Sequence, residues 1–182
     1  MDPLPRVFKI RQKIASPKLA DVEKEMNALL DRFGLAGKVK SGERIALTAG
    51  SRGIRDKAKV LRVIVARLKA LGAKPFIVPC MGSHGGATAE GQVKMLHHLG
   101  ITEEFVGAPI VSSMEVKEIG RTSFGTSVLI DKNICEKADK IIVVNRIKPH
   151  TDFDHEVESG ISKMIVIGMG KSGLVGRKRA AT

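Results

Sequence analysis

Short strand-like segments alternate with amphipathic helical segments along this chain, and this alternation is the feature that most narrowly limits its fold. Three short apolar runs are typical of buried parallel strands: residues 44–48, 75–79 and 140–145. Three segments with apolar residues at every third or fourth position predict helices: residues 19–33, 56–71 and 88–99. The order predicts an α/β fold, with a largely parallel or mixed sheet and helices on both faces.

Shorter segments predict additions to this framework. Residues 7–14 alternate between apolar and polar side chains and predict an opening strand. Three further runs predict short strands of an antiparallel or mixed insertion: residues 109–112, 116–119 and 127–130. Residues 133–138 predict a brief helix, and residues 161–167 fit either a strand or a helix.

The composition is that of a globular protein. With 182 residues, of which 43% are hydrophobic and 27% charged, the chain can bury the core of one domain. No apolar run approaches the roughly 18 residues of a membrane helix, and the N-terminus lacks a signal-peptide pattern. Cys80 and Cys135 are too few for a disulfide or zinc framework. We therefore expect a cytoplasmic, reduced protein with no membrane partner.

The net charge of +12 favours an anionic partner, whether a small ligand, a membrane surface or a nucleic acid. The basic residues are dispersed, and several follow the helix predicted at 56–71, where we expect a solvated surface. The chain has no Trp or Tyr and its six Phe are scattered, so it lacks the aromatic platforms of single-strand binders. A basic nucleic-acid binder is therefore the less favoured alternative.

Glycines and reactive side chains follow each of the three apolar runs. These loops are residues 49–53, 80–86 and 146–155. In an open α/β sheet, ligands bind outside the carboxyl ends of the strands. If the three strands are parallel, the loops meet at one edge and bring Arg52, His84 and His150 within reach of one ligand.

Arg52 and His84 are the candidates in the first two loops. The glycines beside Arg52 leave backbone N–H groups open to an anion at a helix N-terminus, and its guanidinium suits a carboxylate or phosphate. His84 lies among glycines that offer no side chains to bury it, and imidazole ordinarily titrates near pH 6.5, which suits proton transfer. The alternatives are a purely structural turn at Arg52 and a purely structural loop at His84.

The third loop leaves two interpretations open. His150 and His155 bracket two aspartates, which suits either a metal cluster or one catalytic histidine with acidic neighbours. Further along, residues 168–172 end in Gly-Lys-Ser, as a phosphate-binding loop does. Residue 165 is Ile where that motif needs Gly, so the sequence argues against an ATPase.

Three motifs carry the most specific signal. They are Thr-Ala-Gly-Ser-Arg-Gly-Ile at 48–54, Met-Gly-Ser-His-Gly-Gly-Ala-Thr-Ala-Glu-Gly-Gln at 81–92, and Lys-Pro-His at 148–150 followed by Ser-Gly-Ile-Ser-Lys at 159–163. Together they resemble the N-terminal domain of the nickel-dependent lactate racemase family, and racemase-like relatives more than the lactate enzyme itself. The resemblance extends from about residue 15 to residue 171. It implies an isomerase, a racemase or epimerase of a small 2-hydroxy acid.

The resemblance also implies a cofactor and residue roles. The family uses a nickel pincer cofactor, a pyridinium-bisthiocarboxylate mononucleotide tethered to a lysine, which takes up the substrate's α-hydrogen as hydride. By resemblance, His84 and His150 act as acid and base on the two faces of the substrate. Arg52 binds the substrate carboxylate and Lys163 carries the cofactor. The other implied cofactor-binding residues are Ser51, Gly82, Ser83, Gly85 and Gly86.

The sequence departs from the family around the second histidine. The spacing from His150 to Lys163 is longer than in the lactate enzyme, so His155 is an alternative to His150 as the second acid or base. The family's nickel-ligating histidine follows the lysine, whereas no histidine follows His155 here. The nickel ligand is therefore not identified from this sequence.

The family also has a second α/β domain. We expect residues 1–171 to be the racemase-like N-terminal domain and residues 172–182 to be an atypical basic tail, with the C-terminal domain absent. Such a chain is expected to be inactive by itself and prone to self-association through an uncovered site. The main alternative is a non-catalytic α/β module that binds a nucleotide or another anion.

Overall fold

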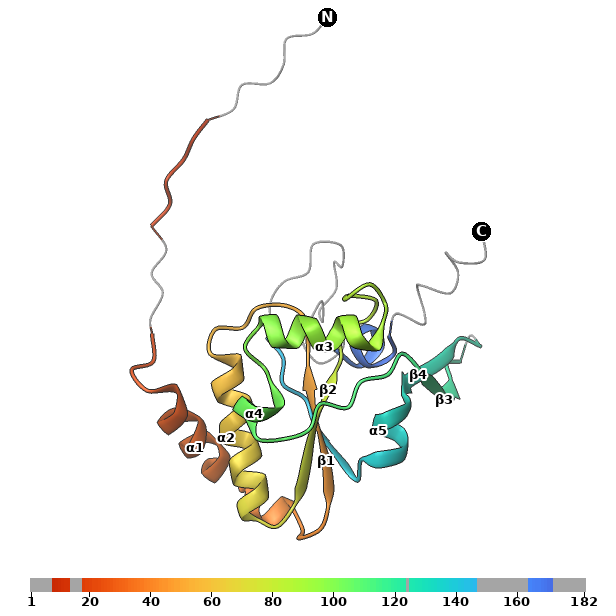
Figure 1. Ribbon diagram of the computed structural model, residues 1–182, viewed down its shortest axis with the longest axis horizontal. Coiled ribbons are helices and arrows are strands. Elements are labelled where there is room, and N and C mark those ends of the chain that lie inside the picture. The colour runs from red at the N-terminus through yellow and green to blue at the C-terminus, as the bar shows by residue number, and fades with distance from the viewer. Residues whose placement is uncertain (1–7, 14–17, 124, 147–163, 172–182) are drawn as a thin grey trace, which may run out of the picture.

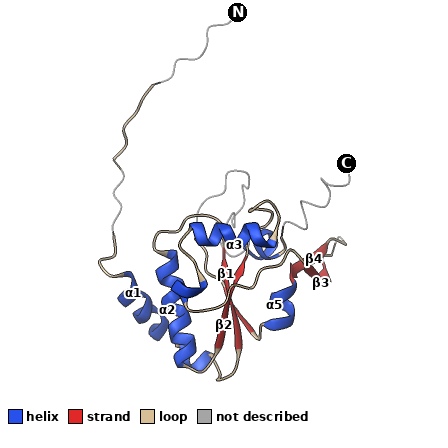
Figure 2. Cartoon of the chain, viewed as in Figure 1, coloured by secondary structure: helices blue, strands red, loops and turns tan. Residues whose placement is uncertain are grey.

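The computed structural model describes residues 8–13, 18–123, 125–146 and 164–171 (Figure 1). At its centre lies a three-stranded sheet in the order β2-β1-β5 (Figure 2). The strands are β1 (Arg44–Ala49), β2 (Lys74–Pro79) and β5 (Lys140–Ile142). β1 is parallel to both of its neighbours. The predicted α/β fold with a largely parallel sheet is therefore confirmed.

One face of the sheet is covered by α2 (Lys57–Ala70), with α3 (Ala89–His98) and α4 (Glu103–Val106) completing the layer (Figure 1). Successive strand side chains point to opposite faces, so alternate residues of β1 reach this layer. Ile45 and Leu47 share one buried cluster with Leu61 and Leu68 of α2. The apolar periodicity of the sequence therefore located the core-facing side of α2 correctly.

The helix α1 (Val22–Arg32) packs on the outside of α2 (Figure 1). The side chain of Asp21 accepts hydrogen bonds from two backbone N–H groups of its first turn and so caps its N-terminus. Arg62 of α2 forms an ion pair with Glu23 of α1. A second ion pair joins Arg67 to Asp31. The sequence analysis expected most basic residues of this helix to lie on a solvated surface, but these two of them pair with α1.

The opposite face of the sheet carries a second layer. It consists of α5 (Lys132–Lys137), the antiparallel hairpin of β3 (Val116–Arg121) and β4 (Ser127–Asp131), and the π-helical turn η2 (Met164–Met169). Seven residues form its buried cluster with the sheet: Ala46, Phe76, Val78, Cys80, Ile134, Met164 and Met169. Helices on both faces and an antiparallel insertion are therefore both confirmed.

Several element predictions need correction. Residues 8–13 form no strand, and residues 109–112 contribute a single bridge, between Ile110 and Ile77. β5 ends at Ile142, because the backbone N–H of Val144 donates to the Thr48 hydroxyl at 3.0 Å instead of continuing the ladder. The ambiguous segment near residue 164 is helical. No helix in the described part of the chain is long and apolar enough to cross a membrane.

Candidate functional site

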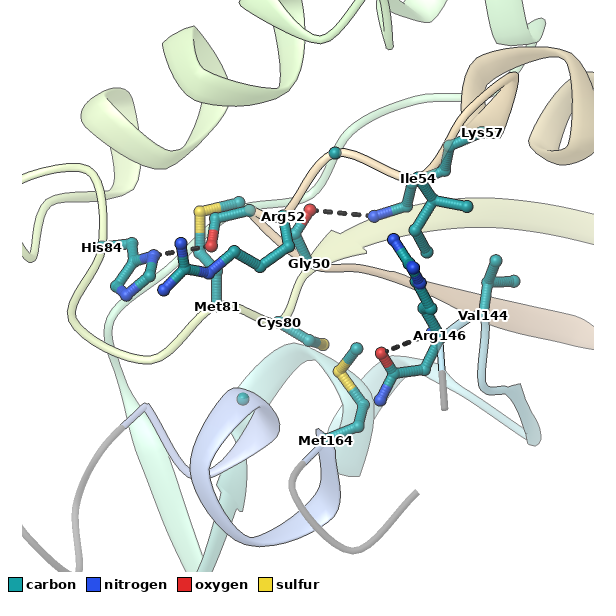
Figure 3. A pocket seen from close by; sticks show the side chains of 14 residues that line it. Gly50, Arg52, Ile54, Lys57, Cys80, Met81, His84, Val144, Arg146 and Met164 are labelled. Carbon is teal, nitrogen blue, oxygen red and sulfur yellow. Dashed lines mark hydrogen bonds between the residues drawn. The ribbon is translucent and has the colours of Figure 1, made fainter. Parts of the chain in front are cut away.

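A pocket of about 270 Å³ opens at the carboxyl ends of the parallel strands (Figure 3). Arg52 lines it from the loop after β1, His84 from the loop after β2, and Arg146 from the segment after β5. Met164 and Gly168 of η2 complete the lining. The structure thus brings the first two predicted loops, and Arg146 at the start of the third, to one edge of the sheet, as expected of ligand sites in such folds.

The structure brings together two of the four principal site residues inferred from the sequence. Arg52 and His84 both line the pocket and are exposed. His150 and Lys163 lie outside the described residues, as does the alternative His155. Their places in the site and the roles assigned to all of these residues stay predictions.

His84 is oriented by a contact between two of the loops. The Ser51 hydroxyl lies 2.6 Å from Nδ1 of His84, and Ser51 also lines the pocket. A hydrogen bond at one ring nitrogen fixes the orientation of an imidazole and biases its tautomer. Nε2 has no partner among the described residues, so it is the nitrogen that can exchange a proton with a ligand.

The glycines around His84 shape the loop and do not line the pocket. Gly82, Gly85 and Gly86 all have positive φ, which other residues rarely adopt. At Gly85 a Cβ would lie 2.6 Å from the backbone of Gly91, so the loop packs directly on the first turn of α3. The structure therefore gives these glycines a supporting position, and their predicted contact with a cofactor, together with that of Ser83, is not tested.

Gln92 of α3 anchors this loop from beneath. Its side chain is fully buried, and its Nε2 donates to the backbone oxygen of Gly82 at 2.8 Å. Its Oε1 accepts from Nζ of Lys171 at 3.0 Å. Because a hydrogen-bonded buried amide is costly to disrupt, Gln92 holds the His84 loop in a defined conformation.

Lys171, which donates to Gln92, is a buried cation. Its Nζ lies 3.1 Å from Oδ2 of Asp131, and it also donates to the backbone oxygen of Pro79. The Lys171 side chain is 2% exposed and the Asp131 side chain is fully buried. Asp131 also caps α5 through its other carboxylate oxygen. The pair ties the His84 loop to the second layer, and the sequence offered no signal for it beyond the Gly-Lys that had been compared with a phosphate-binding loop.

Lys57 is a second buried lysine, and it lines the pocket. It is 4% exposed and donates to the backbone oxygen of Gly50 at 2.8 Å (Figure 3). Burial lowers its pKa from 10.5 to about 8. The sequence analysis placed it on a solvated surface, which is wrong. Lys57 continues the buried stripe of Leu61, Ile64 and Leu68 at helical spacing, and that periodicity was the signal that could have found it.

Cys80 forms part of the pocket wall without being a reactive group. It follows β2, is 2% exposed, and its pKa is raised to about 12 by burial. A thiol rather than a thiolate is therefore present at neutral pH, and the thiol is a weak nucleophile. Gly168 packs so closely here that a Cβ would lie 2.7 Å from the Cys80 carbonyl oxygen. This close approach seats η2 against the end of β2.

The pocket is positively charged. Its lining includes Arg52, Lys57 and Arg146, and none of the described lining residues is acidic. Among the described residues, no group of three or more His, Cys, Asp or Glu could hold a metal ion. The described part of the site is therefore suited to a small organic anion rather than to direct binding of a metal ion.

The chain also matches a known protein family. The model of the lactate racemase N-terminal domain matches residues 6–177, nearly the whole chain. No curated protein and no solved structure gives a significant match.

Proposed function

The chain belongs to the lactate racemase N-terminal domain family, and from that premise we propose that it is the N-terminal domain of a cytoplasmic 2-hydroxyacid racemase or epimerase. The proposal assigns the domain to residues 1–171, followed by a basic tail at 172–182. One observation carries it beyond the family: Arg52 and His84 line the same cationic pocket at the carboxyl edge of the sheet.

Arg52 is proposed to bind the substrate carboxylate. A guanidinium presents paired N–H donors that match the two oxygens of a carboxylate. The absence of acidic residues from the described lining supports this role, because no carboxylate of the protein competes for Arg52 there. The volume of about 270 Å³ suits a substrate of the size of a small hydroxy acid.

His84 is proposed to handle a proton on one face of the substrate. In the tautomer in which Nδ1–H donates to the Ser51 hydroxyl at 2.6 Å, Nε2 can accept the proton of the 2-hydroxyl group and return it. Racemisation needs a proton acceptor on each face of the carbon that changes configuration. His150, or His155 in its place, is proposed for the opposite face, because both belong to the segment that follows β5.

The cationic side chains of the pocket, Arg52, Lys57 and Arg146, suit the anionic part of the family's pincer cofactor. By resemblance, Lys163 would tether the cofactor, and Ser51 with Gly82, Ser83, Gly85 and Gly86 would help to bind it. When bound, the cofactor supplies a pyridinium ring that accepts hydride from the α-carbon. Arg52 orients the substrate for that transfer. The nickel ligand is not assigned.

The exposure of Arg52 and His84 bears on catalysis by the domain itself. Orienting reactants and excluding water supply roughly 7–11 kcal/mol of the barrier reduction in well-ordered sites. We therefore expect this domain to bind substrate and cofactor without appreciable turnover. The second candidate function is a non-catalytic module that binds a nucleotide or another anion. The cationic pocket supports anion binding in both cases.

Two readouts test the proposal. Protein purified from cells that make the pincer cofactor should retain nickel and a visible chromophore, and Lys163→Ala should lose both. A matched variant, Lys59→Ala, alters an exposed lysine and should keep both. Retention of the chromophore by Lys163→Ala, or its absence from the unmodified protein, would contradict the assignment of the cofactor.

A further inference from the structure

The two buried lysines of the described chain differ in their counter-charges. Lys171 has the carboxylate of Asp131 at 3.1 Å, together with acceptors from Gln92 and Pro79. The ammonium group of Lys57 has a single acceptor among the described residues, the Gly50 carbonyl oxygen at 2.8 Å, and no carboxylate within ion-pair distance. An ammonium group carries three N–H donors, so Lys57 is incompletely paired within the described structure.

This arrangement is costly for a protein that has no anion bound. Removing a cation from water is unfavourable unless an opposite charge compensates it. The cost is visible in the pKa of Lys57, which burial lowers to about 8. The ammonium lies at the pocket, where in the view of Figure 3 its nitrogen points at the Gly50 carbonyl oxygen beneath the Arg52 loop.

We propose that Lys57 is an anion-binding residue of this pocket, whose ammonium group pairs with an oxyanion of the bound ligand. The inference rests on the proposed function only in treating the pocket as the ligand site. The oxyanion is a carboxylate or a phosphate, since both offer the oxygen acceptors that an ammonium needs. Arg52 and Lys57 then contact the ligand from the two ends of one loop, residues 50–57.

The alternative is a purely structural lysine that fastens the Arg52 loop through Gly50. The two roles predict opposite effects of Lys57→Met, which keeps the length of the side chain and removes the charge. A structural role predicts a lower melting temperature, because the Gly50 oxygen loses its donor. An anion-binding role predicts an unchanged or higher melting temperature without ligand, because an uncompensated buried charge has been removed.

The pH dependence of binding follows from the groups that face Lys57. Arg52 and Arg146 are the other cationic side chains of the lining. Cys80, at the end of β2, has a pKa of about 12, and η2 contributes only Met164 and Gly168 to the lining. His84 is the other titratable group of the described lining, and a His84→Gln background removes it. In that background, oxyanion affinity should fall as the pH rises through about 8.

The test is calorimetric titration of inorganic phosphate and, separately, of L-lactate at pH 7. Lys57→Met should lower the affinity for the oxyanion that Lys57 binds by roughly 10- to 100-fold. This range corresponds to the loss of one hydrogen bond between charged groups. Which of the two ligands is weakened identifies the source of the oxyanion. The control is Lys59→Met, since Lys59 is exposed and pairs with Asp56 at 3.2 Å. Lys59→Met should bind both anions as the unmodified protein does.

Arg52→Gln separates the two proposals. If Arg52→Gln abolishes binding while Lys57→Met binds both anions normally, the inference about Lys57 is overturned and the proposed function stands. If neither substitution affects binding, both fail. A second readout is acetylation of Lys57 followed by mass spectrometry: saturating oxyanion should slow it and raise its pH midpoint. Equal acetylation with and without the anion would also overturn the inference.

Discussion

The Ser51 hydroxyl lies 2.6 Å from Nδ1 of His84 and so joins the loop after β1 to the loop after β2. These two loops are consecutive in the sheet edge but lie 33 residues apart in sequence. The contact leaves Nε2 as the nitrogen available to a ligand. It also makes the proposed proton acceptor dependent on the same loop that carries Arg52.

The first prediction concerns this contact. Ser51→Ala should remove the bias between the two imidazole tautomers of His84 and increase the motion of its ring, because Nδ1 loses its partner. The nitrogen chemical shifts of His84, measured by NMR, report the tautomers directly. Ser113→Ala is the control, since within the described part of the chain Ser113 accepts a hydrogen bond only from the nearby backbone N–H of Glu115. Identical His84 shifts in Ser51→Ala and unmodified protein would show that the contact does not orient the ring.

The second prediction concerns the buried pair of Lys171 and Asp131. Lys171→Met leaves the Asp131 carboxylate buried and unpaired, which typically costs about 3–5 kcal/mol in the free energy of unfolding. Urea denaturation measures this change. Lys132→Met removes an exposed pair with Glu115 and should have little measurable effect. A Lys171→Met protein as stable as the unmodified one would contradict the role given to the pair.

The third prediction concerns the close packing of the His84 loop on α3. A Cβ at Gly91 would lie 1.8 Å from the Gly85 carbonyl oxygen, so Gly91→Ala must displace the loop. We expect a loss of roughly 1–3 kcal/mol, as for overpacked sites, and altered NMR shifts for His84. Gly86→Ala meets no atom within 4 Å and bears only the strain of positive φ, roughly 1–2 kcal/mol. It should leave Ser51 and His84 in contact. The same His84 shifts in both variants would count against the packing argument.

The fourth prediction concerns the pH dependence of stability. Below pH 8 Lys57 is charged in both the native and the unfolded chain, so the native state bears the full cost of burying the charge. Between about pH 8 and its usual 10.5, the native chain loses this proton while the unfolded chain keeps it. The free energy of unfolding therefore rises with pH over this range. The lowering from 10.5 to about 8 corresponds to roughly 3 kcal/mol.

Comparison with Lys57→Met isolates this contribution, because every other group titrates in both proteins. In urea titrations, the free energy of unfolding of the unmodified protein should rise relative to that of the variant between pH 8 and 10.5. Parallel stability curves across that range would mean that the native Lys57 is not desolvated.

The sequence predicted the framework because apolar periodicity reflects burial directly. β1, β2, α2 and α3 lie within two residues of their expected bounds. Thr88, directly before α3, caps this helix by accepting a hydrogen bond from the backbone N–H of Gly91. The opening strand was predicted wrongly, since residues 8–13 form none. Alternation of apolar and polar side chains shows only that a segment could pair, not that a neighbouring strand is present to pair with it.

Site residues could be predicted where the residue type and its neighbours in sequence indicated a role. They could not be predicted where the role depends on a contact made only in the folded chain. Arg52 and His84 stood out among glycines, and the topology placed them together. Lys57 and Lys171 were missed because a lysine is normally exposed. Their burial depends on contacts with Gly50 and with Asp131, which is 40 residues away in sequence from Lys171 and reached only in the folded chain.

The central claim is that this pocket binds a 2-hydroxy carboxylate, with Arg52 at the carboxylate and His84 at the hydroxyl. The most direct measurement is a calorimetric comparison of lactate with propionate, which lacks the 2-hydroxyl group. We predict that lactate binds more tightly, that His84→Ala removes this preference, and that Arg52→Gln weakens both ligands. The His97→Ala variant, which alters an exposed histidine of α3, should behave as the unmodified protein. Equal affinity for lactate and propionate, or a preference that survives in His84→Ala, would contradict the account.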